Sequence, residues 1–281
     1  MIGPDHATLK SKLSQGQVAV GCLLAYDAPW LVEILGLSGF DFVVIDIEHE
    51  GFSDQAVANL VRTADSVGLD AIVRMPLSER LVPLLDAGVR GVKVPDLRGR
   101  RHAEELVLLT HFHPAGRRTY YTQGRSARYG IGVDEHAWMA AANDRMFLIG
   151  MIEDVEVVRQ IDDILQVDEI DAYHVGPHDL AQSMGYPPPG ELDDVIRGVV
   201  HRCRQAGKYV SVGVVTPWNL DRIDTWIEDG CSFMIVASAW VLSHSFLQIH
   251  NQIRERIPAD RQPPREPLQM VPSKYLNRPQ R

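Results

Sequence analysis

Two carboxylates follow two successive apolar segments of the sequence. The segment Phe147–Ile152 leads into Glu153, and Ala172–Val175 leads through a Gly-Pro-His turn into Asp179. An apolar segment that stops at an acid and continues as a helical pattern is typical of a β-strand that carries a polar group to its C-terminal end. In a barrel of parallel strands these ends form the face where chemistry takes place. Carboxylate oxygens from neighbouring strands suit Mg²⁺ or Mn²⁺, so the pattern predicts a divalent-metal site.

Two other strand ends are expected on the same face. One brings His49, a side chain able to move protons near neutral pH. The other brings Arg74, whose forked guanidinium can hold a carboxylate or a developing enolate. A metal ion, an arginine and a histidine together provide Lewis-acid polarisation, charge neutralisation and a proton carrier. This combination predicts enolate chemistry.

Each of these residues also has a structural interpretation. The two carboxylates could each lie at a helix N-terminus, where the helix dipole and the free N–H groups favour an acid. Arg74 could pair with Asp46 or Glu48 of the neighbouring strand, and a lone histidine is more often structural than catalytic. The catalytic hypothesis depends on four polar residues that share one rim. His174 and His178 flank the site, and we expect them to shape the pocket and not to bind metal.

The alternation of apolar and helical segments sets the fold. Val/Ile-rich segments without a polar face are typical of parallel strands that are covered on both sides. About eight strand–helix units favour a closed (β/α)8 TIM barrel, an α/β fold, over an open α/β sheet. No Gly-x-Gly-x-x-Gly follows the first strand, which weakens the dinucleotide-binding form of the open sheet. The predicted strands lie in residues 18–26, 40–47, 70–74, 91–94, 147–152, 172–175, 209–215 and 231–237.

Two segments interrupt this pattern. Residues 114–146 form a long insertion between units four and five, and such a length favours a functional or interface role. A C-terminal helix is predicted over 240–256. The Pro-, Arg- and Gln-rich residues 258–281 are expected to be an extended or disordered tail. The predicted barrel domain therefore covers residues 1–257.

Composition excludes several classes of partner. The formal net charge of −9 argues against nucleic acid and anionic membranes as partners. We expect no signal peptide and no membrane-spanning segment. The cysteines Cys22, Cys203 and Cys231 are odd in number and widely spaced. Buried free thiols in a reducing, cytoplasmic compartment are therefore expected.

The same segments resemble the HpcH/HpaI family of class II, metal-dependent pyruvate aldolases. The similarity spans roughly residues 15–250 in the order of that family, and only the combination of its pieces is specific. The matching pieces are residues 42–49, Val-Arg-Met-Pro at 73–76, 84–95, Gly-Arg-Arg at 116–118, Arg-Ser-Ala-Arg-Tyr-Gly at 125–130, Ile-Glu at 152–153, and Gly-Pro-His-Asp-Leu at 176–180.

The resemblance implies a role for each site residue. Glu153 and Asp179 would hold Mg²⁺ or Mn²⁺, with Co²⁺ as a further option, and pyruvate or its enolate would chelate that metal. Arg74 would stabilise the enolate oxygen, and His49 would transfer protons. Asp86 would orient His49, in some members across a subunit boundary. Backbone groups at Gly176, Pro177 and His178 would help to seat the substrate carboxylate.

The implied reaction is the making or cleavage of a 4-hydroxy-2-oxo acid from a small 2-oxo acid and an aldehyde. The resemblance also implies a homo-oligomer, a hexamer or trimer of dimers, with swapped C-terminal helices. Decarboxylation of oxaloacetate, or another enolate-capturing reaction on the same site, is the alternative, and a barrel without activity is a third hypothesis. The sequence departs from the family at Leu23, Met151, Ala181 and Trp240, which leaves the aldehyde open.

Overall fold

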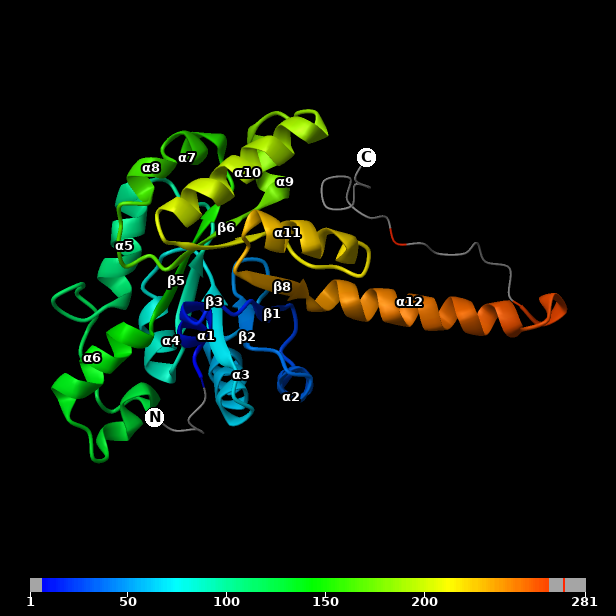
Figure 1. Ribbon diagram of the computed structural model, residues 1–281. Coiled ribbons are helices and arrows are strands. Elements are labelled where there is room, and N and C mark those ends of the chain that lie inside the picture. The colour runs from blue at the N-terminus through cyan, green and yellow to red at the C-terminus, as the bar shows by residue number, and fades with distance from the viewer. Residues whose placement is uncertain (1–6, 263–269, 271–281) are drawn as a thin grey trace.

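Eight parallel strands form the centre of the molecule (Figure 1). The computed structural model describes residues 7–262 and residue 270. The strands follow the order β7-β6-β5-β4-β3-β2-β1-β8, and hydrogen bonds from the N–H groups of Val215 and Ala237 join the two ends of the sheet. The predicted (β/α)8 barrel is therefore confirmed, and the open sheet is excluded. The strands are β1 (Ala19–Leu24), β2 (Phe42–Asp46), β3 (Asp70–Arg74), β4 (Gly91–Val94), β5 (Phe147–Ile152), β6 (Ala172–Val175), β7 (Tyr209–Val212) and β8 (Phe233–Ala237).

Helices surround the barrel in the order that the sequence predicts. Ser53 begins the helix after β2, because its hydroxyl accepts a hydrogen bond from the N–H of Ala56. The helices are α1 (Leu9–Ser14), α2 (Pro29–Leu37), α3 (Asp54–Ser66), α4 (Leu81–Ala87), α5 (Arg100–Thr110), α6 (Glu135–Arg145), α7 (Val155–Arg159), α8 (Ile161–Ile164), α9 (Pro177–Ser183), α10 (Pro189–Gln205), α11 (Ile223–Asp229) and α12 (Ser238–Arg256). Three 3₁₀ turns cover Arg125–Gly130, Leu220–Arg222 and Ala259–Arg261.

The barrel has two apolar layers. Alternate strand residues either face the helices or fill the interior, as the two-residue period of a strand requires. The interior layer is closed at the N-terminal end of the barrel by α1, whose Leu9 and Leu13 are buried in it. The N–H of Leu9 donates to Oδ2 of Asp70 at 2.6 Å, which fixes this short helix to β3. The sequence analysis did not predict α1. The three cysteines are buried and free, as expected.

The long insertion is attached to the barrel. Its helix α6 brings Trp138 against Phe112, with ring centroids 5.0 Å apart. Asn143 donates to the carbonyl of Phe112 and accepts from its N–H, at 3.0 and 2.7 Å. The insertion is therefore a docked subdomain of residues 114–146 and not a free loop.

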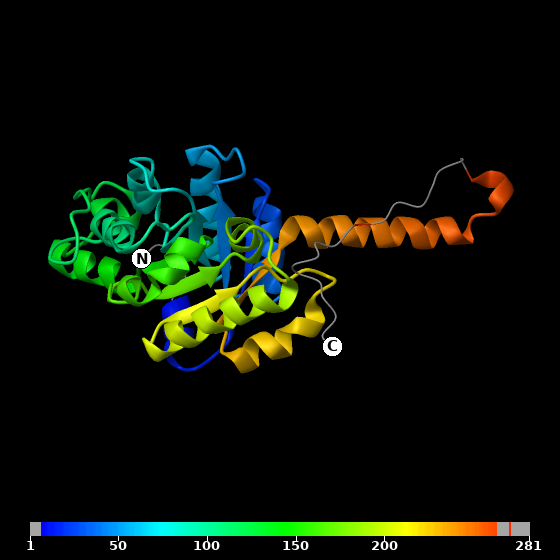
Figure 2. The same ribbon diagram turned by 90° about the horizontal axis from the view of Figure 1, so that it is seen from above.

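The C-terminal helix projects away from the barrel in both views (Figures 1 and 2). Its side chains Phe246, Ile249 and Ile253 are exposed. The predicted tail begins at residue 258, and most of it, 263–269 and 271–281, lies outside the described residues. Within the described part of the chain, no helix is both long enough and apolar enough to cross a membrane.

Candidate active site

An open pocket lies at the C-terminal ends of the strands. It has a volume of about 410 Å³ and is mostly acidic. Residues that follow β2, β4, β5 and β6 contribute to it, so the ends of four strands converge there. This is the end of a parallel barrel at which active sites are found. The lining residues are Glu48, His49, Asp96, Glu153, Asp154, Asp179, Gln182 and Ser183.

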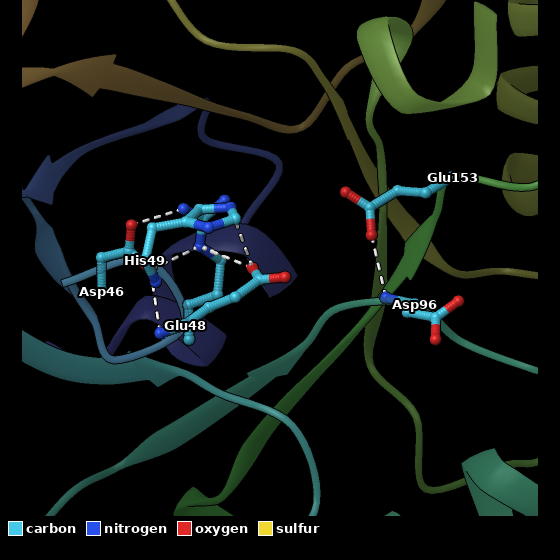
Figure 3. A network of polar contacts seen from close by, with 6 residues as sticks. Asp46, Glu48, His49, Asp96 and Glu153 are labelled. Atoms are coloured by element: carbon cyan, nitrogen blue, oxygen red, sulfur yellow. Dashed lines mark hydrogen bonds and ion pairs between the residues drawn. The ribbon is translucent and has the colours of Figure 1, made fainter. Parts of the chain in front are cut away.

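Glu153 directly follows β5 and is held by backbone groups. Its Oε2 accepts a hydrogen bond of 2.9 Å from the N–H of Asp96, and in Figure 3 its carboxylate points toward the side where Glu48 and His49 lie. A Cβ atom on Gly176 would lie 2.8 Å from its Oε1 and its Cγ, so any other residue at 176 would force the Glu153 side chain to shift. Burial raises the pKa of Glu153, the Asp96 N–H opposes this shift, and the charges of Asp179 and Glu48 add to it.

Asp179 lies in the first turn of α9 and shares the pocket with Glu153. The two carboxylates interact electrostatically: the negative charge of Asp179 raises the pKa of Glu153. Two carboxylates that share a pocket are hard oxygen donors of the kind that Mg²⁺ and Mn²⁺ bind. Within the described chain, no cluster of three or more His, Cys, Asp or Glu side chains forms a complete metal site. Glu153 and Asp179 therefore have the chemistry to hold a divalent metal ion.

Arg74 ends β3 and is bound on one side by acids of β2. Its Nε and Nη2 donate to the two carboxylate oxygens of Asp46, at 2.8 and 2.5 Å, and Nε lies 3.4 Å from Oε2 of Glu48. Burial lowers the pKa of Arg74, but the hydrogen bond and charge of Asp46 outweigh this effect and the net shift is upward. Arg74 therefore does pair with Asp46 and Glu48, which the sequence analysis gave as its structural interpretation. This pairing fixes the plane of the guanidinium beside the pocket.

His49 stands at the pocket entrance. Its imidazole is 66% exposed, and its Nε2 lies 3.6 Å from Oε2 of Glu48. Figure 3 shows His49, Glu48 and Asp46 together on one side of the site and Glu153 with Asp96 on the other. A histidine that is open to solvent and faces a pocket can exchange protons with water as well as with a bound molecule.

The predicted carboxylate seat lies at the start of α9. Gly176 precedes this helix, and Pro177 and His178 form its first turn. Burial lowers the pKa of His178, so the imidazole tends to be neutral, and the charge of Asp179 opposes this shift. These residues therefore lie next to Asp179 at the start of α9, and their role in seating the substrate carboxylate stays a prediction.

Asp86 is not part of this pocket in a single chain. It lies in the last turn of α4, which runs from β3 toward the start of β4, at the opposite end of the barrel. Its Oδ1 accepts a hydrogen bond of 3.0 Å from Nη2 of Arg118, which belongs to the insertion. The structure therefore brings Glu153, Asp179, Arg74 and His49 to one rim and leaves Asp86 away from it.

Two residues of this region were missed by the sequence analysis. Asp96 contributes only its backbone N–H, and such a contact cannot be predicted from the type of side chain. Lys93 lies inside β4, and its charge reaches both Glu153 and Arg74. A lysine within an otherwise apolar strand, Gly-Val-Lys-Val, was the available signal.

Several known proteins are similar to this chain. Residues 20–238 match the family described as HpcH/HpaI aldolase/citrate lyase. A hydroxypyruvate/pyruvate aldolase of Roseovarius nubinhibens is 29% identical over 234 residues, which cover 82% of this chain and 89% of that protein. A 2-keto-3-deoxy-L-rhamnonate aldolase of Klebsiella pneumoniae is 30% identical over 233 residues, which cover 81% and 85%.

A solved structure shares the fold over nearly its whole length. The HpcH/HpaI aldolase of Desulfitobacterium hafniense DCB-2 superimposes with a TM-score of 0.82 at 25% identity, covering 90% of this chain and 98% of that one. The predicted family and the predicted aldolase type of carbon–carbon lyase are thereby confirmed. The chain belongs to the HpcH/HpaI aldolase/citrate lyase family.

Proposed function

We propose that this aldolase makes or cleaves 4-hydroxy-2-oxo acids, with a divalent metal ion held by Glu153 and Asp179. One observation carries the proposal: these two carboxylates share a pocket with His49 and lie beside a half-buried arginine, Arg74. The oxo-acid partner of the aldehyde is pyruvate or a close analogue. The names of the relatives, which include pyruvate and hydroxypyruvate, favour this class of substrate.

The proposed metal, Mg²⁺ or Mn²⁺, supplies Lewis-acid polarisation of the 2-oxo group and so acidifies the neighbouring carbon. Arg74 is proposed to donate to the oxygen that becomes negative as the enolate forms. Its Asp46 contacts leave only part of its donor set available, in a fixed plane. The start of α9, from Gly176 to His178, is proposed to hold the substrate carboxylate.

His49 is proposed to carry protons between solvent and the substrate. In the direction of synthesis it would protonate the new hydroxyl oxygen, and in cleavage it would accept that proton. Its position at the open side of the pocket and its contact with Glu48 support this role.

Asp86 enters the scheme only through a second copy of the chain. In its own chain it is paired with Arg118 at the far end of the barrel. We propose a homo-oligomer in which Asp86 of one copy faces His49 of another. The projecting helix α12, with its exposed Phe246, Ile249 and Ile253, supports association of copies.

Release of pyruvate from defined substrates tests the proposal. The protein is treated with a chelator, supplied with Mn²⁺, and incubated separately with a 4-hydroxy-2-oxo acid and with oxaloacetate. We expect metal-dependent pyruvate release from the first, loss of this activity in Glu153→Ala, and retention in the matched variant Glu156→Ala, an exposed glutamate on α7 that pairs with Arg159. Release only from oxaloacetate would favour the decarboxylase, and metal-independent release would contradict the metal site.

A further inference from the structure

Polar side chains replace apolar ones on part of the inner wall of the barrel. On β4, β6 and β7 the flanking residues are buried in the outer core with the helices, whereas Lys93, His174 and Ser211 alternate with them and face inward. His174 and Ser211 are register partners on adjacent strands. These three residues, which we call the inner polar wall, lie within the strands, ahead of the C-terminal strand ends at which the pocket opens.

The inner polar wall lacks the partners that buried polar groups normally have. Nδ1 of His174 and Oγ of Ser211 are buried without a hydrogen-bond partner. Lys93 is 1% exposed, and no carboxylate of the described residues lies within ion-pair distance of its ammonium group. A buried lysine with no close partner is costly to a fold, so it indicates a charge needed for another purpose.

The balance of charges around the pocket indicates what a buried lysine could do there. Acids outnumber cations around the site: Asp46, Glu48, Asp96, Glu153, Asp154 and Asp179 stand against Arg74 and Lys93. A divalent ion would reduce this excess of negative charge. A 2-oxo acid then brings a further negative charge into the site, and its enolate brings a second.

We infer that Lys93 is a buried cation of the substrate site, which stabilises the anionic oxygens of a bound 2-oxo acid and its enolate through the electric field. It is a positioning residue, since it acts through the field of the pocket and not by contact with the reacting atoms. The inference rests on the proposed function and deepens it, because it assigns the site a selectivity for substrates that carry more than one negative oxygen.

The charges of Arg74 and Glu153 both act on Lys93, which agrees with a position close to these two groups. Burial, together with the charge of Arg74, lowers the pKa of Lys93 to about 7, although the charges of Glu153, Asp46 and Glu48 oppose the shift. The same two cations, Lys93 and Arg74, add to the burial that lowers the pKa of His174. An anion bound above the inner polar wall would favour the protonated lysine.

Binding measurements with Mn²⁺ and oxalate test the inference without turnover. Oxalate is the probe because it is a small dianion that resembles a planar enolate of a 2-oxo acid. Lys93→Met removes the charge at nearly the same volume. Since a nearby cation repels a metal ion and attracts an anion, we expect Mn²⁺ to bind about tenfold more tightly to the variant, and oxalate to bind the Mn²⁺-loaded variant about tenfold more weakly.

A matched control and a second variant keep the outcome interpretable. Lys208→Met makes the same chemical change at the other end of the barrel, where Lys208 donates to the carbonyls of Val167 and Asp168, and it should change neither affinity. Lys93→Gln keeps a polar group without the charge and should follow Lys93→Met, so it serves if the methionine variant does not fold.

The rise in Mn²⁺ affinity and the fall in oxalate affinity distinguish an electrostatic role of Lys93 from a purely structural one. If Lys93 only supports the fold, both affinities fall together, and this result overturns the inference, as does no change in either. If the unsubstituted protein binds no Mn²⁺, or binds it equally well after Glu153→Ala, the proposed function and the inference fail together. Normal Mn²⁺ binding with no response to Lys93→Met leaves the proposed function standing and removes the inference alone.

Discussion

Glu153 and Asp96 are joined by a hydrogen bond of 2.9 Å from the backbone N–H of Asp96 to Oε2 of Glu153. Asp96 has a left-handed backbone conformation, with φ of 48°, which aspartate adopts more readily than most residues other than glycine. The other carboxylate oxygen, Oε1, lies over Gly176. Two backbone segments, after β4 and after β6, therefore fix the orientation of the carboxylate that we assign to the metal.

The space over Gly176 yields a first prediction. Gly176→Ala places a Cβ 2.8 Å from Oε1 and Cγ of Glu153, so the carboxylate must move. We expect Mn²⁺ affinity to fall about 10- to 100-fold, the range found when the support of a metal ligand is changed. Titration of the protein with Mn²⁺ measures this. The control is Gly198→Ala in α10, where the new Cβ meets no atom within 4 Å and Mn²⁺ affinity should not change. Equal affinities for both variants would remove Gly176 from the metal site.

Arg74→Ala should lower kcat by about 10²- to 10³-fold, because it removes a fixed donor to the developing oxyanion. Steady-state kinetics with a 4-hydroxy-2-oxo acid measure this loss. The substitution also leaves the buried Asp46 without its arginine, so circular dichroism must first establish that the variant is folded. Arg80→Ala, which breaks a surface pair with Asp54, should keep full activity. Undiminished cleavage by a folded Arg74→Ala protein would contradict the assignment.

His49→Gln should slow proton transfer while leaving the fold intact, since the imidazole is largely exposed. General acid–base groups contribute about 10²- to 10⁴-fold, and kcat is expected to fall within that range. Exchange of the pyruvate methyl protons in D₂O, followed by NMR, shows in addition whether His49 acts in enolate formation or only on the aldol oxygen. His136→Gln, on the exposed part of α6, is the matched control and should behave like the unsubstituted protein.

Metal binding should weaken as the pH falls. Burial and the neighbouring acids Asp179 and Glu48 raise the pKa of Glu153, so this carboxyl holds its proton to a higher pH than an exposed glutamate. A metal ion must displace that proton, and Mn²⁺ affinity therefore rises with pH until the raised pKa is passed. Calorimetric titrations in buffers of different ionisation enthalpy measure the protons released. In Glu153→Gln this contribution should disappear, and an unchanged proton release would show that another group is responsible.

The strands could be predicted from sequence because each is a short Val/Ile-rich segment that is covered on both sides, and all eight lie where the pattern places them. Because these strands are apolar on both faces, the sequence did not predict the inner polar wall. When both faces of a strand are apolar, its sequence does not indicate which residues point inward, so the inward position of Lys93 was not predicted. Helix α1 was missed because its six residues form a helix mainly through Leu9 and Leu13 docking in the barrel, a contact far along the chain.

Residue types and their order along the chain determined that Glu153, Asp179, Arg74 and His49 stand at one rim, because consecutive parallel strands must end at the same face. Tertiary structure decided which neighbouring groups contact these four side chains. It placed the Asp96 N–H and Gly176 against Glu153, paired Arg74 with Asp46, and took Asp86 to the opposite end of the barrel. Such contacts depend on register and on the packing of segments distant in sequence, which no local pattern of residues specifies.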